Sequence, residues 1–337
     1  MGYTNIKKYI VITSIFNPTE AVLAFSKMDN YHLIVVGDKK TPENWYCENV
    51  DYLSIKQQET FDFELAKVLP YNHYCRKMIG YLRAIQYGAD SIIDTDDDNI
   101  PKDKWDFPEF EKEYNCVAEY RGFINVYQLY TKQKIWPRGL PLNLINKQFD
   151  IESSLRIKNC KVGVWQGLAD ENPDVDAIYR LTNDALCYFI DRDPVILDKG
   201  CFSPFNTQNT LIRKELFALM YLPAYVTFRF TDILRGLIAQ PIMWLYDYQL
   251  GFTNATVVQK RNFHDYMKDF ISEVPMYQYC EKVIELVLGS ISTSESIYNN
   301  LYNAYDSLSK ENIICKKEIV TLSAWLKDLE KLCCIKN

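Results

Sequence analysis

The sequence has few of the residues on which several common protein classes depend. Its 337 residues include only 12 glycines and 3 histidines, and its 10 cysteines are scattered without a Cys-x-x-Cys motif. Zinc fingers, iron–sulfur clusters and disulfide scaffolds are therefore disfavoured. The longest uncharged stretches, Gly200–Ile212 and Leu216–Phe228, have 13 residues each, whereas a membrane-spanning helix needs about 20 apolar residues. Since Met1–Lys8 also lacks a signal-peptide pattern, we expect a cytoplasmic protein without a membrane span.

The charge and aromatic content narrow the choice of partners. The net charge is −6, from 38 basic and 44 acidic residues, which disfavours nucleic acid and anionic lipid as partners. Aromatic residues make up 14% of the chain, with 25 tyrosines and 17 phenylalanines. Such side chains are large and stiff, and open binding clefts often use them as platforms.

The first hundred residues alternate between strand and helix patterns. The predicted strands are Tyr9–Ile15, Tyr31–Val36, Val50–Leu53 and Ser91–Asp94, and the predicted helices are Ala21–Met28, Phe61–Val68 and Tyr74–Tyr87. This alternation predicts an α/β fold with a mostly parallel central sheet flanked by helices. Ligands of such sheets bind at the carboxyl ends of the strands.

The rest of the chain changes character twice. Residues 101–185 are predicted to be loop-rich, with later strands at Ile196–Cys201 and Thr210–Ile212 and a helix at Asp232–Tyr246. Three further helices are predicted, at Tyr266–Val287, Ile297–Leu308 and Lys316–Leu332. We therefore divide the chain into an α/β domain, residues 1–265, and a helical C-terminal extension, residues 266–337. The aromatic-rich C-terminal helices could form a homo-oligomer interface.

The strongest chemical signal is the run Asp-Thr-Asp-Asp-Asp-Asn at residues 94–99. It follows a predicted buried strand, so its carboxylates are expected at the carboxyl edge of the sheet. Carboxylates in this position can hold Mn²⁺ or Mg²⁺, which share their oxygen ligands with a substrate diphosphate. Asp96 and Asp98 are the preferred metal ligands. An acidic surface turn is the structural alternative, whereas an EF-hand is excluded because its glycine and distal glutamate are missing.

Two other segments carry candidate binding residues. Arg76 lies near the start of a predicted helix, where a basic side chain can bind a diphosphate, while Arg83 on the same face is better explained as solvated. Arg138 lies in Trp-Pro-Arg-Gly, residues 136–139, which suits a loop that closes on an anionic or sugar ligand. A well-packed structural loop explains this segment equally well.

Several blocks of the sequence resemble the STELLO glycosyltransferase-like family, in family order across roughly residues 9–265. They are Val35–Pro42 with Trp45, Leu69–Gly88, Asp94–Asn99, Ile135–Leu142, Gln166–Asp170 with Pro173–Asp176, and Arg229–Gly236 with Gln240. The block Leu69–Gly88 with its acidic run also resembles, more weakly, the reversibly glycosylated polypeptides, which are UDP-arabinopyranose mutases.

The resemblance implies a glycosyltransferase-A fold in which the acidic run is a DxD motif for a metal-bound nucleotide-sugar. It implies that Asp232, at a helix start, is the catalytic carboxylate of an inverting enzyme, although a helix cap is its structural alternative. It also implies that His264 completes the metal shell, although a surface histidine at the start of the next helix explains this residue equally well. The residues expected to bind the nucleotide-sugar are Thr13, Ser14, Asp38, Arg76, Asp94, Asp97, Arg138 and Asp170.

The function predicted on this basis is a metal-dependent glycosyltransferase that uses a UDP-sugar, Mn²⁺ or Mg²⁺ and an unknown acceptor. One alternative is a nucleotide-sugar mutase, and another is a catalytically silent scaffold for other transferases. Plant members of the family work in the Golgi through a membrane anchor. We therefore expect a Golgi-lumenal location only if such an anchor has been removed from this chain.

Overall fold

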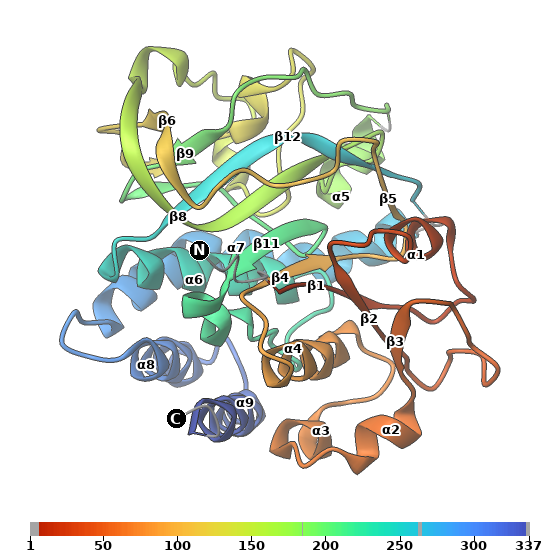
Figure 1. Cartoon of the computed structure of the whole chain (residues 1–337). Coiled ribbons are helices and arrows are strands. Elements are labelled where there is room, and N and C mark those ends of the chain that lie inside the picture. The colour runs from red at the N-terminus through yellow and green to blue at the C-terminus, as the bar shows by residue number, and fades with distance from the viewer. Residues whose placement is uncertain (1–6, 184, 262–264, 335–337) are drawn as a thin grey trace, which may run out of the picture.

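A ten-stranded β-sheet forms the centre of the computed structural model, which describes residues 7–183, 185–261 and 265–334 (Figure 1). The strand order is β3-β2-β1-β4-β11-β8-β6-β9-β12-β5, and β8 also pairs with β12. Its strands are β1 (Lys8–Thr13), β2 (His32–Val36), β3 (Val50–Leu53), β4 (Ser91–Thr95), β5 (Asn99–Pro101), β6 (Glu111–Val117), β8 (Leu155–Asp170), β9 (Val195–Leu197), β11 (Asn209–Arg213) and β12 (Gln249–Gln259). The short strands β7 (Gly122–Phe123) and β10 (Cys201–Phe202) pair separately.

Most of the helices described pack on one face of this sheet, and α1 packs on the other. The α-helices are α1 (Glu20–Phe25), α2 (Ile55–Thr60), α3 (Glu64–Val68), α4 (Lys77–Gln86), α5 (Ala177–Thr182), α6 (Thr231–Leu245), α7 (Tyr266–Ser290), α8 (Ile297–Lys310) and α9 (Lys316–Cys334). Short 3-10 helices are η1 (Tyr74–Arg76), η2 (Val126–Leu129), η3 (Leu142–Leu144), η4 (Glu152–Ser154) and η5 (Lys214–Met220). Among the helices of the described ranges, none combines the length and the apolar composition that a bilayer crossing requires.

The mixed α/β class is confirmed, but the sheet is mixed and not mostly parallel: among its described strands, half of the pairings are parallel, including β8 with β12 and β6 with β9. Strands β3, β2, β1 and β4 are parallel neighbours, whereas β11 is antiparallel to both β4 and β8. Antiparallel pairs also join β6 to β8 and β12 to both β9 and β5. A strand that is buried on both faces is a continuous run of apolar residues, and this run does not indicate the direction of the strand. The sequence pattern therefore did not show which strands are antiparallel.

The region predicted to be loop-rich contains the longest strand of the described residues, β8, with 16 residues. Its first half is largely exposed and pairs with β6, while its buried second half pairs with β12. This change of environment along one strand leaves no single period in the sequence, which explains why the pattern was missed.

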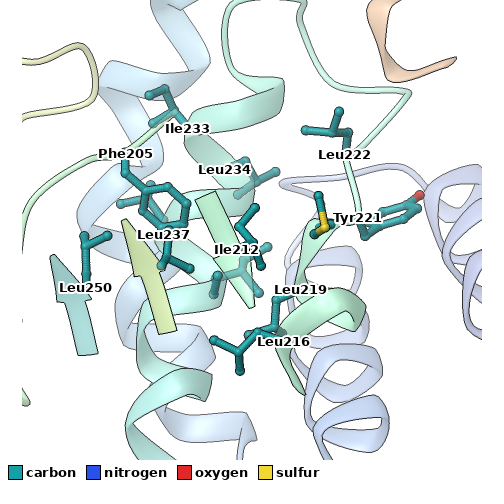
Figure 2. Close-up of a cluster of buried hydrophobic side chains, with 14 of the residues drawn as sticks. Phe205, Ile212, Leu216, Leu219, Tyr221, Leu222, Ile233, Leu234, Leu237 and Leu250 are labelled. Carbon is teal, nitrogen blue, oxygen red and sulfur yellow. The ribbon is translucent and has the colours of Figure 1, made fainter. Parts of the chain in front are cut away.

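The parallel strands separate two hydrophobic clusters by the alternation of their side chains. Tyr9 and Val11 of β1 face the cluster under α4 and α6–α9, while Ile10 and Ile12 face the cluster around α1 and Trp105. Figure 2 shows the first cluster where the buried side chains of Leu237, Leu216 and Leu250 gather between helices and strands. Gly80 lets α4 approach this sheet closely, because a Cβ there would lie 2.5 Å from Val11 and 2.7 Å from Val36.

The C-terminal helices pack on the same side of the sheet as α3, α4 and α6 (Figure 1). Three buried carboxylates on α7 and α9 accept backbone N–H groups from distant loops. Glu273 accepts from Ala177, Glu318 accepts from Ala224 and Tyr225, and Asp328 accepts from Glu64 and Leu65. The division of the chain at residue 265 and the homo-oligomer interface stay predictions.

We predict that Asp328→Ala destabilises the protein by about 1–2 kcal/mol, the usual cost of losing a helix N-cap. Helix α3 has no capping side chain of its own, and Asp328 accepts from the first two N–H groups of α3 at 2.9 and 2.8 Å. Urea denaturation measures the change in the free energy of unfolding. The control is Lys327→Ala, at an exposed neighbour on the same helix, and equal effects of both variants would contradict the capping role.

Candidate active site

A cavity of about 430 Å³ opens at the carboxyl ends of β1, β2 and β4. Of the predicted site residues, Thr13, Ser14, Asp38, Arg76, Asp96, Asp97, Asp98, Arg138 and Asp232 line this cavity. They come from segments more than two hundred residues apart in the chain. The fold thus places the acidic run and the start of α6 around one cavity.

Asp94 lies beneath the cavity and does not line it. Its carboxylate has no solvent exposure, and it pairs with Lys77 Nζ at 2.9 Å and with Arg235 Nη1 at 2.8 Å. Lys77 also donates to Asp96 Oδ1 at 2.8 Å and to the Thr95 carbonyl at 2.8 Å. Burial alone would lower the pKa of Lys77, but the two carboxylates raise it, so the lysine stays charged. Asp94 therefore holds the loop in place from below.

Asp96, Asp97 and Asp98 face the cavity with incomplete charge compensation. Burial raises the pKa of Asp96 to about 6, although Lys77 offsets part of this effect. Burial, together with the charges of Asp96 and Asp97, raises the pKa of Asp98 to about 7. Among the described residues, the Asp98 carboxylate has one side-chain hydrogen-bond partner. The Gln259 Nε2 donates to its Oδ1 at 3.3 Å and to its Oδ2 at 3.1 Å. A half-buried carboxylate without a cationic partner favours the binding of a cation.

The donor set fits a divalent cation that shares its shell with a substrate. Within the described residues, no group of three or more Asp, Glu, His or Cys side chains is arranged to hold a metal ion by itself. Mg²⁺ commonly binds through one or two carboxylates, with substrate phosphates and water as the other ligands. Asp96 and Asp98 can supply those carboxylates. His264 lies outside the described residues.

The ends of β1 and β2 form the wall beside the acidic run. Ser14 donates to the Asp97 carboxylate at 2.5 Å, which ties the end of β1 to the run. Asp38 accepts from the His73 backbone at 3.2 Å. Arg76 donates from Nε and Nη2 to Gln58 Oε1 at 3.0 and 2.6 Å, and Gln58 in turn donates to the Gly37 carbonyl. Arg76 thereby supports the turn that carries Asp38.

Arg138 forms the centre of the opposite wall. Its Nε and Nη2 donate to Asp174 at 2.8 Å each, and its Nη1 and Nη2 donate to Asp232 at 3.0 and 2.8 Å. The remaining Nη1 donor goes to the Arg229 carbonyl. A guanidinium has five N–H donors, and all of them have partners within the protein. Arg138 therefore fixes Asp174 and Asp232, with no donor left for a ligand.

Asp232 is buried in the first turn of α6 and is held as a carboxylate. Burial would raise its pKa, but Arg138 outweighs burial and lowers it. The Tyr74 hydroxyl lies 3.4 Å from Asp232 Oδ1 and 3.2 Å from its backbone nitrogen. Asp174 has three short hydrogen bonds, including one from Asn206 at 2.8 Å, whereas Asp232 has two. Arg138 thus holds Asp232 as a carboxylate in the lining of the cavity.

Asp170 is the other predicted residue that the fold leaves out of the cavity lining. It pairs with Lys102 at 2.5 Å and accepts from the Phe189 backbone at 3.0 Å. Sequence reasoning missed Lys77, Asp174, Arg235 and Gln259 as parts of the site. Lys77, Asp174 and Arg235 lie within the family-like blocks, but only the fold shows that they pair with predicted site residues.

The comparisons with known proteins agree with the sequence blocks. A model of the family described as STELLO glycosyltransferases matches residues 229–335. Two proteins of Arabidopsis thaliana, "Probable glycosyltransferase STELLO1" and "Probable glycosyltransferase STELLO2", are 26% and 25% identical to 96% of this chain. The resemblance to the STELLO glycosyltransferases is confirmed. It continues beyond residue 265 into the C-terminal helices, and the chain spans 44% of the length of each STELLO relative.

We predict that Arg138→Met lowers the free energy of unfolding by about 3–5 kcal/mol, because it leaves two buried carboxylates without their cation. The wild-type pKa of Asp232 is lowered, so its pairing contributes fully above the ordinary carboxyl pKa and is lost as the pH falls through the lowered one. The deficit should therefore be constant from neutral pH down to about 4 and shrink as the pH falls below that value. Urea denaturation across pH measures it.

The matched control is Lys132→Met, which removes an exposed positive charge from the same part of the chain. It should change the free energy of unfolding little at any pH. A pH-independent deficit in Arg138→Met would mean that packing, rather than charge, explains the role of Arg138.

Proposed function

We propose that this protein is a metal-dependent glycosyltransferase of the glycosyltransferase-A fold that transfers a sugar from a UDP-sugar donor to an acceptor hydroxyl. The observation that carries the proposal is one cavity with two different walls. Asp96 and Asp98, short of compensating charge, lie on one wall, and Asp232, fixed by Arg138, lies on the other. The resemblance to STELLO glycosyltransferases supports sugar transfer as the chemistry.

The proposed roles follow from position in the cavity. Thr13, Ser14 and Asp38 would contact the nucleoside, because they lie at the carboxyl ends of β1 and β2. Asp96 and Asp98 would hold Mn²⁺ or Mg²⁺, which when bound offsets the negative charge of the diphosphate. Asp97, tied to Ser14, would orient the donor sugar or the nucleoside.

Asp232 would take the proton of the acceptor if the enzyme inverts the sugar. In that step the acceptor oxygen bonds to the anomeric carbon, the bond from that carbon to the diphosphate breaks, and its electron pair leaves with UDP. The hydroxyl proton passes to Asp232 Oδ2, whose partner in the structure is Arg138. Because the pKa of Asp232 is lowered, it is a weak base, and we expect the proton to move late, as the new bond forms.

The first test concerns the cation. UDP with Mn²⁺ should raise the melting temperature of the wild-type protein by mass action, and UDP alone should do so less. Asp98→Asn should weaken Mn²⁺-dependent UDP binding about tenfold or more, the equivalent of one lost charge-assisted contact. Its ligand-free melting temperature should not fall, since the change removes a half-buried negative charge beside Asp96 and Asp97.

The control for this test is Asp103→Asn, at an exposed carboxylate that follows β5 and lies outside the cavity lining. It should bind UDP as the wild type does. Absence of any UDP shift in the wild-type protein would contradict the proposal and favour a scaffold. Isomerisation of a UDP-sugar without release of UDP would favour the mutase.

The second test separates binding from chemistry at the Arg138 pair. Asp232→Asn should keep its affinity for UDP and lower the release of UDP from UDP-sugars by about 10²–10⁴-fold, the usual contribution of a general base. Asp174→Asn is the matched control, since it also removes one carboxylate from Arg138. Equal losses of turnover in both variants would mean that Asp232 only helps to hold Arg138 in place and does not accept the proton.

A further inference from the structure

An exposed phenylalanine stands out in the lining of the cavity. Phe228 is 53% exposed, although large apolar side chains of this protein are mostly buried. Its ring packs edge-on against Tyr74, with centroids 4.7 Å apart, and lies 5.3 Å from the ring of His73. His73 and Tyr74 are themselves stacked at 5.3 Å with an interplanar angle of 12°. Phe228 is therefore held from behind by two rings, while about half of its surface faces the solvent.

The backbone around Phe228 links this ring to the proposed base. The Tyr74 hydroxyl lies 3.4 Å from the Phe228 carbonyl and 3.4 Å from Asp232 Oδ1. Arg229, the next residue, donates from Nε to Glu273 at 2.9 Å and from its backbone to Ser272 at 3.0 Å. Both of these contacts are made to α7. The segment that carries Phe228 is therefore held by α7 and by Tyr74. Phe228 is thus an apolar ring held in a fixed position in the lining of the cavity, as a binding site requires.

We propose that Phe228, supported by His73 and Tyr74, is the acceptor platform: it binds the apolar face of a pyranose ring and presents a hydroxyl of that sugar to Asp232. This inference rests on the proposed function and adds its acceptor class, a glycan or glycoside. A pyranose has one face of C–H groups and an edge of hydroxyls. Phe228 can pack against the C–H face, and the charged side chains around it can form hydrogen bonds with the hydroxyls of the edge.

The charge of the surroundings favours a sugar over a lipid acceptor. Asp174, Asp232, Arg229 and Arg261 line the same cavity as Phe228. A long acyl chain would need a continuous apolar groove, whereas an apolar ring beside charged side chains suits an amphipathic sugar. The other exposed apolar side chains of the lining, Ile15 and Phe16, follow β1 at the end of the cavity proposed for the nucleoside.

The uracil of the donor, expected at the ends of β1 and β2, is the competing occupant, since His73 beside Phe228 donates to Asp38 there. Phe228 packs more closely on Tyr74, whose hydroxyl lies 3.4 Å from Asp232, and this favours the acceptor.

The experiment measures sugar and nucleotide binding separately. Methyl glycosides of D-glucose and D-galactose are titrated into the protein with UDP and Mg²⁺, and saturation-transfer NMR follows their C–H protons. Wild-type protein should bind at least one of them. Phe228→Ala should weaken that binding about threefold to tenfold, the range expected for a lost aromatic contact, while Phe228→Trp should retain it. UDP affinity should be the same in all three proteins.

The control is Tyr46→Ala, which removes an aromatic side chain that is 78% exposed and lies outside the cavity lining. It should leave sugar binding unchanged. Loss of UDP affinity in Phe228→Ala would overturn the inference, because the ring would then stack on uracil. Failure of every methyl glycoside to bind, or equal binding by Phe228→Ala, would also overturn it. In each of these cases the UDP and Mn²⁺ shift of the wild-type protein reports separately whether the proposed function holds.

Discussion

The buried carboxylate of Asp94 is the constraint on which the site depends. An unpaired charge without solvent exposure would cost several kcal/mol, so β4 can end at this position only if cations reach it. Lys77 comes from the start of α4 and Arg235 from the middle of α6, and each pairs with one oxygen of Asp94. The same lysine holds Asp96. The ion pairs thus join β4, α4 and α6 and set the position of the acidic run above them.

The charges around the cavity fall into two groups with different physical roles. Asp94, Arg138 and Asp174 are saturated by partners within the protein, and their contribution is to hold other residues in place. Asp98, in contrast, has an amide partner and a raised pKa, and Asp232 is held as a carboxylate by Arg138. The charges that position other residues are therefore fully paired, whereas Asp98, proposed to hold the cation, has only an amide partner among the described residues. This division is what electrostatic preorganisation requires.

The C-terminal helices take part in this arrangement although they are far from it in sequence. Glu273 on α7 binds Arg229 and caps the start of α5, and Glu318 on α9 accepts from the backbone of residues 224 and 225. Both contacts fix the segment that leads to Phe228 and Asp232. Buried carboxylates that accept backbone N–H groups are costly to remove, because the donors would be left unsatisfied. The wall of the cavity is thus supported by helices that the sequence alone suggested to be an extension.

The sequence by itself determined the α/β class, most of the helices and the place of the acidic run after a buried strand, because these features depend on local periodicity and on residue type. It also carried the resemblance to the STELLO glycosyltransferases, through blocks such as Asp94–Asn99. Only the tertiary structure decided the direction of β11 and the length of β8, since pairing partners lie far apart in the chain. It also decided which carboxylates are structural. Asp94 and Asp98 have the same side chain in one short run, and their difference arises from Lys77, Arg235 and Gln259, which folding brings beside them.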